Sequence, residues 1–235
     1  MSAAASPPQG VATTRIWDVP VRLTHWALVV AVAGSWLSHY GGAGWFAVHR
    51  YCGYSVLVLV AFRLCWGFVG TRHARFRNFL AGPRRMLAYV RGGWRGVEAG
   101  HNPLGGWSVV ALLLLLGLQA ATGLCANDEI ASAGPFYGWI SHETSNRLTA
   151  LHHGNANWLL ALITLHVLAI AVYEWRLGKS LLRAMVTGRK PAAAVPAGAG
   201  IGSSHTLRAL ILLGVIALVL AVVLRLAPDS APALF

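Results

Sequence analysis

The sequence predicts an all-α membrane protein built as a transmembrane helical bundle. Its 235 residues are 56% hydrophobic and only 11% charged, and the mean hydropathy is +0.58. The apolar residues come in long runs instead of along one face of a helical period, which is typical of membrane-spanning helices. A span needs about 20 residues, so one domain of this length has room for four or five spans.

Five apolar segments are long enough to be spans, and we expect four to form a core and the fifth to follow it. They are expected at about 19–40, 48–69, 104–125, 148–175 and 207–226. Pro103 can open the third segment, because proline is tolerated in the first turn of a helix. Residues 71–100, which are rich in arginine and glycine, favour an interfacial loop with a short amphipathic helix. Residues 127–146 favour a polar loop.

The same pattern divides the chain into five parts. Residues 1–14 have no apolar core, so a disordered cytoplasmic N-terminus is expected there and not a cleaved secretory signal. The four-helix domain is expected at 15–190 and a Pro/Ala/Gly-rich linker at 191–204. An extra transmembrane helix at 205–227 and an outer tail at 228–235 complete the chain.

The formal net charge of +12 indicates orientation in a membrane and not nucleic-acid binding. The basic residues lie between the apolar segments, whereas a nucleic-acid-binding domain gathers them on one face. Most of the 19 Lys and Arg residues fall on one side of the expected bundle, and Arg50, Arg147 and Arg225 fall on the other. Cytoplasmic loops carry the excess of Lys and Arg, so we expect the N-terminus in the cytoplasm and the C-terminus outside.

Two histidines of the fourth expected span, His152 and His166, indicate a cofactor. They are fourteen residues apart, so both point to nearly the same face, about 21 Å from each other along the helix axis. An ionisable residue within a span is costly and usually functional. Haem iron takes two axial ligands, and neutral imidazole suits both positions. This spacing therefore predicts one haem ligand near each side of the hydrocarbon core.

The other spans offer a partner histidine at each depth. His25, near the start of the first span, matches His166, and His49, at the start of the second, matches His152. His39 also lies fourteen residues after His25, so it could take the place of His49, and the spacing alone leaves both open. His49 is preferred because His39 adjoins a glycine-rich loop that is expected to fray. Two bis-histidine haems, one above the other, are expected.

Three further residues are candidate contacts of the cofactor. Arg63 follows His49 by fourteen residues and lies at cytoplasmic depth, where its guanidinium could pair with haem propionates. The alternative is an arginine that snorkels to the membrane interface. His73 and His101 lie in or next to the basic loop, where they could contact propionates or a quinone headgroup. The chain has no Cys-x-x-Cys-His motif for covalent haem attachment.

Several short motifs between Arg15 and Lys190 are specific when taken together. They are Trp17-Asp18 and residues 21–26, 49–54, 63–70, 73–76, 100–106, 152–157 and 165–167. With these motifs the chain resembles the bacterial cytochrome b561 family, which includes the b-type cytochrome subunits of nickel-iron hydrogenases. The resemblance implies a four-helix core and two haems b. It implies axial ligands at His25, His49, His152 and His166, which decides against His39.

The resemblance also implies a multi-pass protein of the bacterial cytoplasmic (inner) membrane that transfers electrons between the quinone pool and a redox partner. That partner would be a cytochrome c or an oxidoreductase subunit. Iron with two axial imidazoles has no open position for substrate, which favours electron transfer. Two alternatives remain: an oxidoreductase acting on quinone or superoxide at a haem edge, and a histidine-rich metal transporter or membrane anchor. Metal transport predicts acidic co-ligands, and the cores of the first four spans contain no Asp or Glu.

Overall fold

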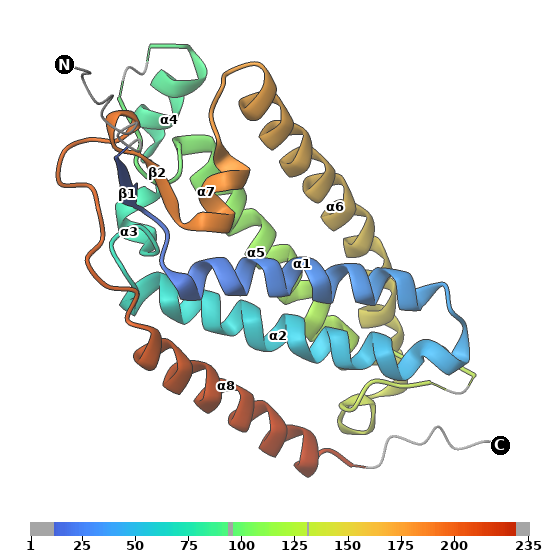
Figure 1. Cartoon of the computed structure of the whole chain (residues 1–235). Coiled ribbons are helices and arrows are strands. Elements are labelled where there is room, and N and C mark those ends of the chain that lie inside the picture. Colours follow the sequence, from blue (N-terminus) through green and yellow to red (C-terminus); the bar gives the residue numbers. More distant parts are fainter. Residues whose placement is uncertain (1–11, 94–95, 131, 229–235) are drawn as a thin grey trace, which may run out of the picture.

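The computed structural model describes residues 12–93, 96–130 and 132–228. Within these residues the chain is mainly helical, with one two-stranded sheet (Figure 1). The long helices are α1 (Val19–His39), α2 (Phe46–Val69), α5 (Pro103–Gly123), α6 (His142–Trp175) and α8 (Thr206–Leu226). Residues 1–11 and 229–235, which hold most of the expected N-terminal and outer tails, lie outside the described residues.

The long helices coincide closely with the five expected apolar segments, except at the start of α6. The polar loop was expected to reach residue 146, but the helix already begins at His142. Ser141 caps it, because its hydroxyl oxygen accepts the N–H of Thr144, and Glu143 pairs with Arg147 one turn later. These polar interactions extend the helix beyond the apolar segment that was used to predict it.

Four of the helices, α2, α5, α6 and α8, are long and apolar enough to cross a membrane. Helix α1 has 21 residues but is not among them. Its first turns contain Arg22 and His25 and its last turn contains Ser38 and His39, and these polar residues lower its hydropathy. The first of the five expected spans is therefore a helix of the right length that composition alone does not identify as a span.

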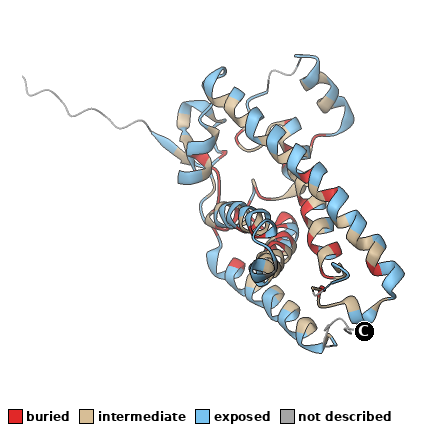
Figure 2. Cartoon of the chain, turned by 90° about the vertical axis from the view of Figure 1, so that its right-hand side faces the viewer, coloured by how far each residue is buried: buried red, intermediate tan, exposed pale blue. Residues whose placement is uncertain are grey.

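The long helices pack as two antiparallel pairs. Helix α1 packs along α2, α5 packs along α6, and α2 also contacts α5 and α8 (Figure 1). A core cluster that includes Ala31, Val60, Leu116 and Leu159 joins the two pairs. Helix α1 does not pack extensively on α6. Figure 2 shows exposed residues over the outer sides of α6 and α8, as expected for helices that face lipid.

One end of the bundle carries most of the basic residues and is called the basic end. Here strand β1 (Thr13–Arg15) pairs antiparallel with β2 (Arg189–Pro191), with Thr14 opposite Lys190. The disordered N-terminus expected up to residue 14 is thus wrong for residues 13 and 14. Main-chain pairing orders them, and the next side chains, Ile16 and Trp17, are buried in a core with Trp66.

The segment expected to be a linker, residues 191–204, also packs against the basic end. It contains a short 3-10 helix, η3 (Ala192–Ala194). The N–H of Ile201 donates to the carbonyl of Arg15, and the hydroxyl of Ser204 accepts the N–H of Val19. The segment therefore ties the start of α8 to the start of α1.

Short helices complete the two ends. The basic end holds α3 (Phe76–Phe79), α4 (Pro83–Val90) and α7 (Leu181–Thr187). The amphipathic helix expected within residues 71–100 is confirmed as α4, and α7 was not predicted. The opposite end, called the turn end, holds η1 (Ala43–Trp45) between α1 and α2 and η2 (Tyr137–Trp139) between α5 and α6.

Candidate cofactor site

Four histidines gather at the turn end. They are His39 at the end of α1, His49 in the first turn of α2, and His152 and His153 in α6. The ring centroids are 6.3 Å apart for His49 and His152, and 6.3 Å apart for His39 and His153. His39 and His49 are also 6.3 Å apart. The fold thus brings His39 and His49, the two alternative partners expected for His152, to the same place.

These separations fit two imidazoles bound to one iron. Metal–imidazole bonds of about 2 Å, plus about 1 Å from each bonding nitrogen to its ring centroid, place two axial rings about 6 Å apart. The His49–His152 pair meets this requirement without any movement of the helices. The His39–His49 and His39–His153 pairs meet it as well, so distance does not distinguish the ligands.

Hydrogen bonds to Nδ1, the ring nitrogen that would not bind the iron, favour His49 and His152 as the ligands. Nδ1 of His49 lies 2.8 Å from the carbonyl oxygen of Ser35, and Nδ1 of His152 lies 3.0 Å from that of Gln119. A ring N–H that donates to a backbone carbonyl fixes the tautomer and leaves Nε2 for a metal. Both rings are half-buried, whereas His39 is exposed. In the described part of the chain no such bond holds the ring of His39.

Two glycines leave room beside these ligands. A Cβ on Gly123 would lie 3.0 Å from Cε1 of His152, so a larger residue would make a tight contact that pushes on this ring. Gly53, one turn after His49, faces open space, since no described atom of a neighbouring residue lies within 4 Å of the position that a Cβ would take. A flat macrocycle beside His49 needs such space next to the helix backbone, so the residues present fit a haem.

Gln119 and Asn155 are polar residues of the site that the sequence analysis missed. Nε2 of Gln119 lies 3.0 Å from Nε2 of His152, and the Asn155 amide donates to Oε1 of Gln119 at 2.7 Å. Gln119 therefore occupies the ring nitrogen that a metal would need. The available signal was the position of both amides within apolar spans, because a polar group there is costly unless it has a partner.

His25 and His166 lie toward the basic end, one on α1 and the other on α6. Both are half-buried, and they are close enough to interact electrostatically. Nδ1 of His25 is buried and has no hydrogen-bond partner among the described residues. The ring of His25 therefore lacks the carbonyl partner that holds Nδ1 of His49 and of His152.

Arg63 is buried within the protein and does not snorkel to the interface. Only 6% of the residue is exposed, and Nη1 donates to the carbonyl of Ala74 at 3.2 Å. The guanidinium carbon also lies 5.4 Å from the ring centroid of Phe76. The snorkelling alternative of the sequence analysis is thus not observed. The remaining guanidinium donors have no hydrogen-bond partner among the described residues and can bind an acidic group at this depth.

His73 and His101 lie together at the basic end, and both are near Trp17. Their ring centroids are 6.5 Å and 4.7 Å from that of Trp17. Nε2 of His73 lies 2.6 Å from the carbonyl oxygen of Ala199, in the segment before α8. A hollow of about 190 Å³ is lined by both histidines, Phe79 and Ala199. The fold thus brings two of the predicted cofactor contacts to one surface.

Burial and nearby positive charge keep His101 neutral. Desolvation, followed by repulsion from Arg63 and Lys190, lowers the pKa of His101 to about 3. Nδ1 of this ring is buried without a hydrogen-bond partner in the part of the chain that the structure describes. Burial also lowers the pKa of His73. A neutral imidazole can donate one hydrogen bond and accept another, which is suited to a quinone or carboxylic acid group.

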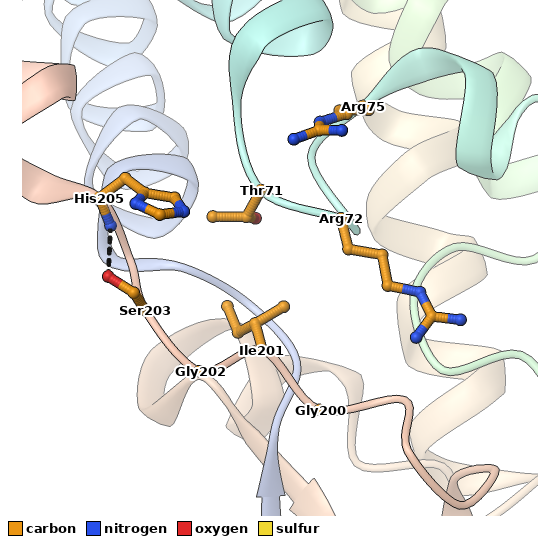
Figure 3. A pocket seen from close by; sticks show the side chains of 8 residues that line it. All are labelled: Thr71, Arg72, Arg75, Gly200, Ile201, Gly202, Ser203 and His205. Atoms are coloured by element: carbon orange, nitrogen blue, oxygen red, sulfur yellow. Dashed lines mark hydrogen bonds between the residues drawn. The ribbon is translucent and has the colours of Figure 1, made fainter.

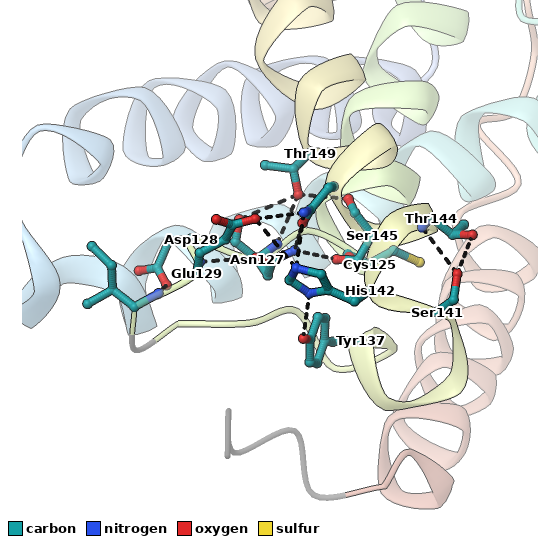
Figure 4. Close-up of polar contacts among 12 residues, drawn as sticks. Cys125, Asn127, Asp128, Glu129, Tyr137, Ser141, His142, Thr144, Ser145 and Thr149 are labelled. Carbon is teal, nitrogen blue, oxygen red and sulfur yellow. Dashed lines mark hydrogen bonds and ion pairs between the residues drawn. The ribbon is translucent and has the colours of Figure 1, made fainter. Parts of the chain in front are cut away.

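A hydrogen-bonded loop closes the turn end between α5 and α6 (Figure 4). The side-chain amide of Asn127 donates to Oγ of Ser145 at 2.6 Å, and that hydroxyl donates to the carbonyl of Cys125 at 2.7 Å. His142 lies 3.6 Å from Glu129 and 3.1 Å from the Tyr137 hydroxyl. The loop fixes where α6 begins, and hence the depth of His152.

Among the described residues, no three His, Cys, Asp or Glu side chains converge as a group that could hold a metal ion. Two protein ligands per iron are enough for haem, since the macrocycle supplies the remaining four. A haem site in this fold therefore needs only a pair of histidines, such as those found at two positions along α6.

A family model described as prokaryotic cytochrome b561 matches residues 16–188 of the chain. The match covers α1 to α7 and all seven residues that the sequence analysis assigned to the cofactor. The segment from β2 to α8 lies outside it. No curated protein and no solved structure matches the chain.

Proposed function

Because the chain belongs to the prokaryotic cytochrome b561 family of membrane b-type cytochromes, we propose that it transfers electrons between the quinone pool and a redox partner through two bis-histidine haems. The observation that carries this proposal is the pairing of histidines at two depths along α6. Bound haem b supplies reversible one-electron chemistry, and two axial imidazoles leave its iron without an open position for substrate.

The proposed ligands are His49 with His152 at the turn end and His25 with His166 at the basic end. Support for the first pair comes from the 6.3 Å ring separation and from the carbonyls that hold both Nδ1 atoms. Support for the second pair comes from the closeness of the two half-buried rings, which interact electrostatically. Gln119 has to release Nε2 of His152 before a metal binds there.

Arg63, His73 and His101 are proposed to bind the acidic and polar groups at the basic end. The buried guanidinium of Arg63 suits a propionate, because a charged pair at this depth offsets the cost of burying the arginine. The neutral rings of His73 and His101 line a hollow, which favours this end for the quinone headgroup. The redox partner would then approach the turn end.

We propose that the protein lies in the bacterial cytoplasmic (inner) membrane with five spans, the N-terminus inside and the C-terminus outside. The concentration of Lys and Arg at the basic end supports this orientation. Helix α1 is proposed as a span because Asp18 at its start bonds Trp66 near the end of α2, so the two helices run antiparallel over the same depth.

A haem assay on single-histidine variants tests the proposal. The purified wild type is expected to contain two haems per chain by pyridine haemochrome analysis. His25→Ala and His166→Ala should each remove one haem, and the same one, as judged by redox titration of the visible spectrum. His49→Ala and His152→Ala should each remove the other haem, because each variant deletes one of its two axial bonds to iron.

His39→Ala and His153→Ala are the matched controls, because the ring of His39 lies 6.3 Å from that of His49, the ring of His153 lies 6.0 Å from that of His152, and both are exposed. Both controls should keep two haems. Loss of a haem in His39→Ala but not in His49→Ala would show that the ligand at the turn end is misassigned. A protein that stays colourless after haem supplementation would contradict the function itself.

A further inference from the structure

A second hollow lies at the basic end, between the end of α2 and the start of α8. It measures about 250 Å³, and its lining includes Thr71, Arg72 and Arg75 from the loop after α2. The opposite wall is formed by Ile201, Ser203 and His205, just before α8 (Figure 3). One wall belongs to the part of the chain that matches the family model, and the other lies beyond it.

The lining is rich in hydrogen-bond donors that are free for a ligand. Nε of Arg75 donates to the carbonyl of Gly70 at 2.7 Å, and Nη1 of Arg72 donates to that of Gly198 at 2.9 Å. Each guanidinium has five N–H donors, so most of them remain available. Oγ of Ser203 accepts the N–H of His205 at 3.2 Å and can donate its own proton.

The described residues of the lining include no carboxylate, so its charge is positive. One carboxylate, that of Asp18, is hydrogen-bonded to a residue of the lining: it accepts the hydroxyl proton of Thr71 at 2.5 Å. Asp18 is 1% exposed and also accepts hydrogen bonds from Trp66 and from the N–H of Val21. The negative charge of Asp18 is therefore satisfied by these buried hydrogen bonds and does not face the hollow. The hollow suits an anion.

The position of the hollow identifies the kind of anion. It lies between the end of one candidate span, α2, and the start of another, α8, which is the level of lipid headgroups. Basic pockets between helix ends at a membrane surface bind acidic headgroups. The first residues of α8 beside the hollow include Leu207 and Leu210, which are 73% and 59% exposed and offer an apolar surface to acyl chains.

We propose that this hollow binds the phosphate group of an anionic phospholipid such as phosphatidylglycerol. Arg72 and Arg75 bind the phosphate oxygens, Ser203 and His205 close the site from the other wall, and the acyl chains lie along α8. The bound lipid then joins α8, which lies outside the family match, to the family core. None of the four proposed haem ligands lines this hollow, and Arg72 is shared with the hollow that contains His73 and His101.

The test uses the full-length protein in nanodiscs of phosphatidylcholine with a minor fraction of phosphatidylglycerol, and native mass spectrometry counts the lipids that stay bound. The wild type should retain phosphatidylglycerol in preference to phosphatidylcholine. Arg75→Gln should weaken retention by about tenfold, because a charge-assisted hydrogen bond is lost. Arg75→Lys should recover part of the preference. Ser203→Ala, which leaves the loop after α2 untouched, should weaken retention less.

Arg77→Gln is the control, because Arg77 is an exposed neighbour of equal charge that does not line the hollow. If it weakens retention as much as Arg75→Gln, the proposal is overturned in favour of a nonspecific basic surface. Equal retention of the two lipids by the wild type also overturns it. In a second arm, inorganic phosphate is added to the nanodiscs. Displacement of the lipid at millimolar phosphate would identify a free-phosphate site instead.

Discussion

Asp18 joins the start of α1 to the end of α2 through one buried carboxylate. It caps α1 by accepting the N–H of Val21 at 2.6 Å, and it accepts hydrogen bonds from Trp66 at 3.1 Å and Thr71 at 2.5 Å. A buried carboxylate is stable only when its oxygens are satisfied in this way. Asp18 therefore fixes the register of α1 against α2, and with it the depth of His25 relative to the histidines of α6.

The neutral state of His101 makes stability depend on pH. Its pKa is lowered to about 3 in the folded protein, whereas an unfolded imidazole titrates near 6.5. Between these values the unfolded state binds more protons, so the contribution of His101 is full above pH 6.5 and is lost as the pH falls toward 3. We expect the free energy of unfolding to fall between about pH 7 and about pH 5, by up to about 1.4 kcal/mol per pH unit, and the melting temperature to fall with it.

Circular dichroism melts in detergent at several pH values measure this effect. His101→Gln keeps a polar side chain that does not titrate, so its melting temperature should change less over the same range. His205→Gln is the control, because His205 is exposed and should leave the pH dependence of the wild type unchanged. Equal pH dependence in the wild type and His101→Gln would show that other groups cause the acid loss.

Single residues differ in how far the sequence predicts their role. The fourteen-residue interval between His152 and His166 is a local property of one helix, so it predicts their common face directly. The choice between His39 and His49 depends on the turn between α1 and α2, which places both rings within 6.3 Å of each other. No local rule predicts the carbonyl of Ser35 as the partner of His49, because it belongs to a different helix.

At the scale of elements, the close packing of α1 on α2 depends on Gly34. A Cβ at this position would lie 2.8 Å from Sγ of Cys52 in α2, which is closer than side-chain atoms approach. Gly34→Ala should therefore destabilise the protein by about 1–2 kcal/mol, because overpacking a tight contact costs this much. Thermal unfolding followed by circular dichroism measures the change.

The double variant Gly34→Ala with Cys52→Ala distinguishes this contact from other effects, since it removes the sulfur that the new methyl group would meet. Its stability should be higher than that of Gly34→Ala alone. Gly214→Ala in α8 is the control: apart from the adjacent residues and backbone of its own helix, no described atom lies within 4 Å of its Cβ position, so it should be neutral or slightly stabilising. If Cys52→Ala brings no recovery, the helices are not packed through this pair.

Hydropathy predicts elements well only where the membrane dictates their composition. The apolar runs of α2, α5 and α8 were located to within about two residues, because a span must be apolar over its whole length. The first turns of α6 are polar and were missed, since Ser141 and Glu143 stabilise the helix by capping and charge. Strands β1 and β2 were missed because they pair residues far apart in the sequence, such as Thr14 with Lys190.

At the scale of the whole molecule, the alternation of spans predicts which histidines share a depth, because successive spans cross the membrane in opposite directions. That argument placed His25 with His166 and His49 with His152 before any contact was known. It could not predict that α1 packs on α2 instead of on α6, or that residues 191–204 fold back to the basic end. Both depend on side-chain contacts between segments distant in the sequence.

The number of spans decides on which side of the membrane each end of the chain lies. Composition identifies four spans among the described residues, which would put both ends of the chain on one side. Five spans, with α1 included, put them on opposite sides. The contact of Asp18 with Trp66 favours five, because α1 can reach the end of α2 only by running back over the full depth that α2 crosses.

Reporter fusions to the two ends of the chain distinguish these topologies. A green fluorescent protein at the N-terminus should be fluorescent, since it folds on the cytoplasmic side, and an alkaline phosphatase at the C-terminus should be active, since it requires the outside. Exchanging the two reporters should silence both, which controls for expression. If both ends give the cytoplasmic signal, α8 does not cross the membrane. If both give the signal of the outer side, α1 does not cross it. His25 would then lie at the depth of His152, and its pairing with His166 would be impossible.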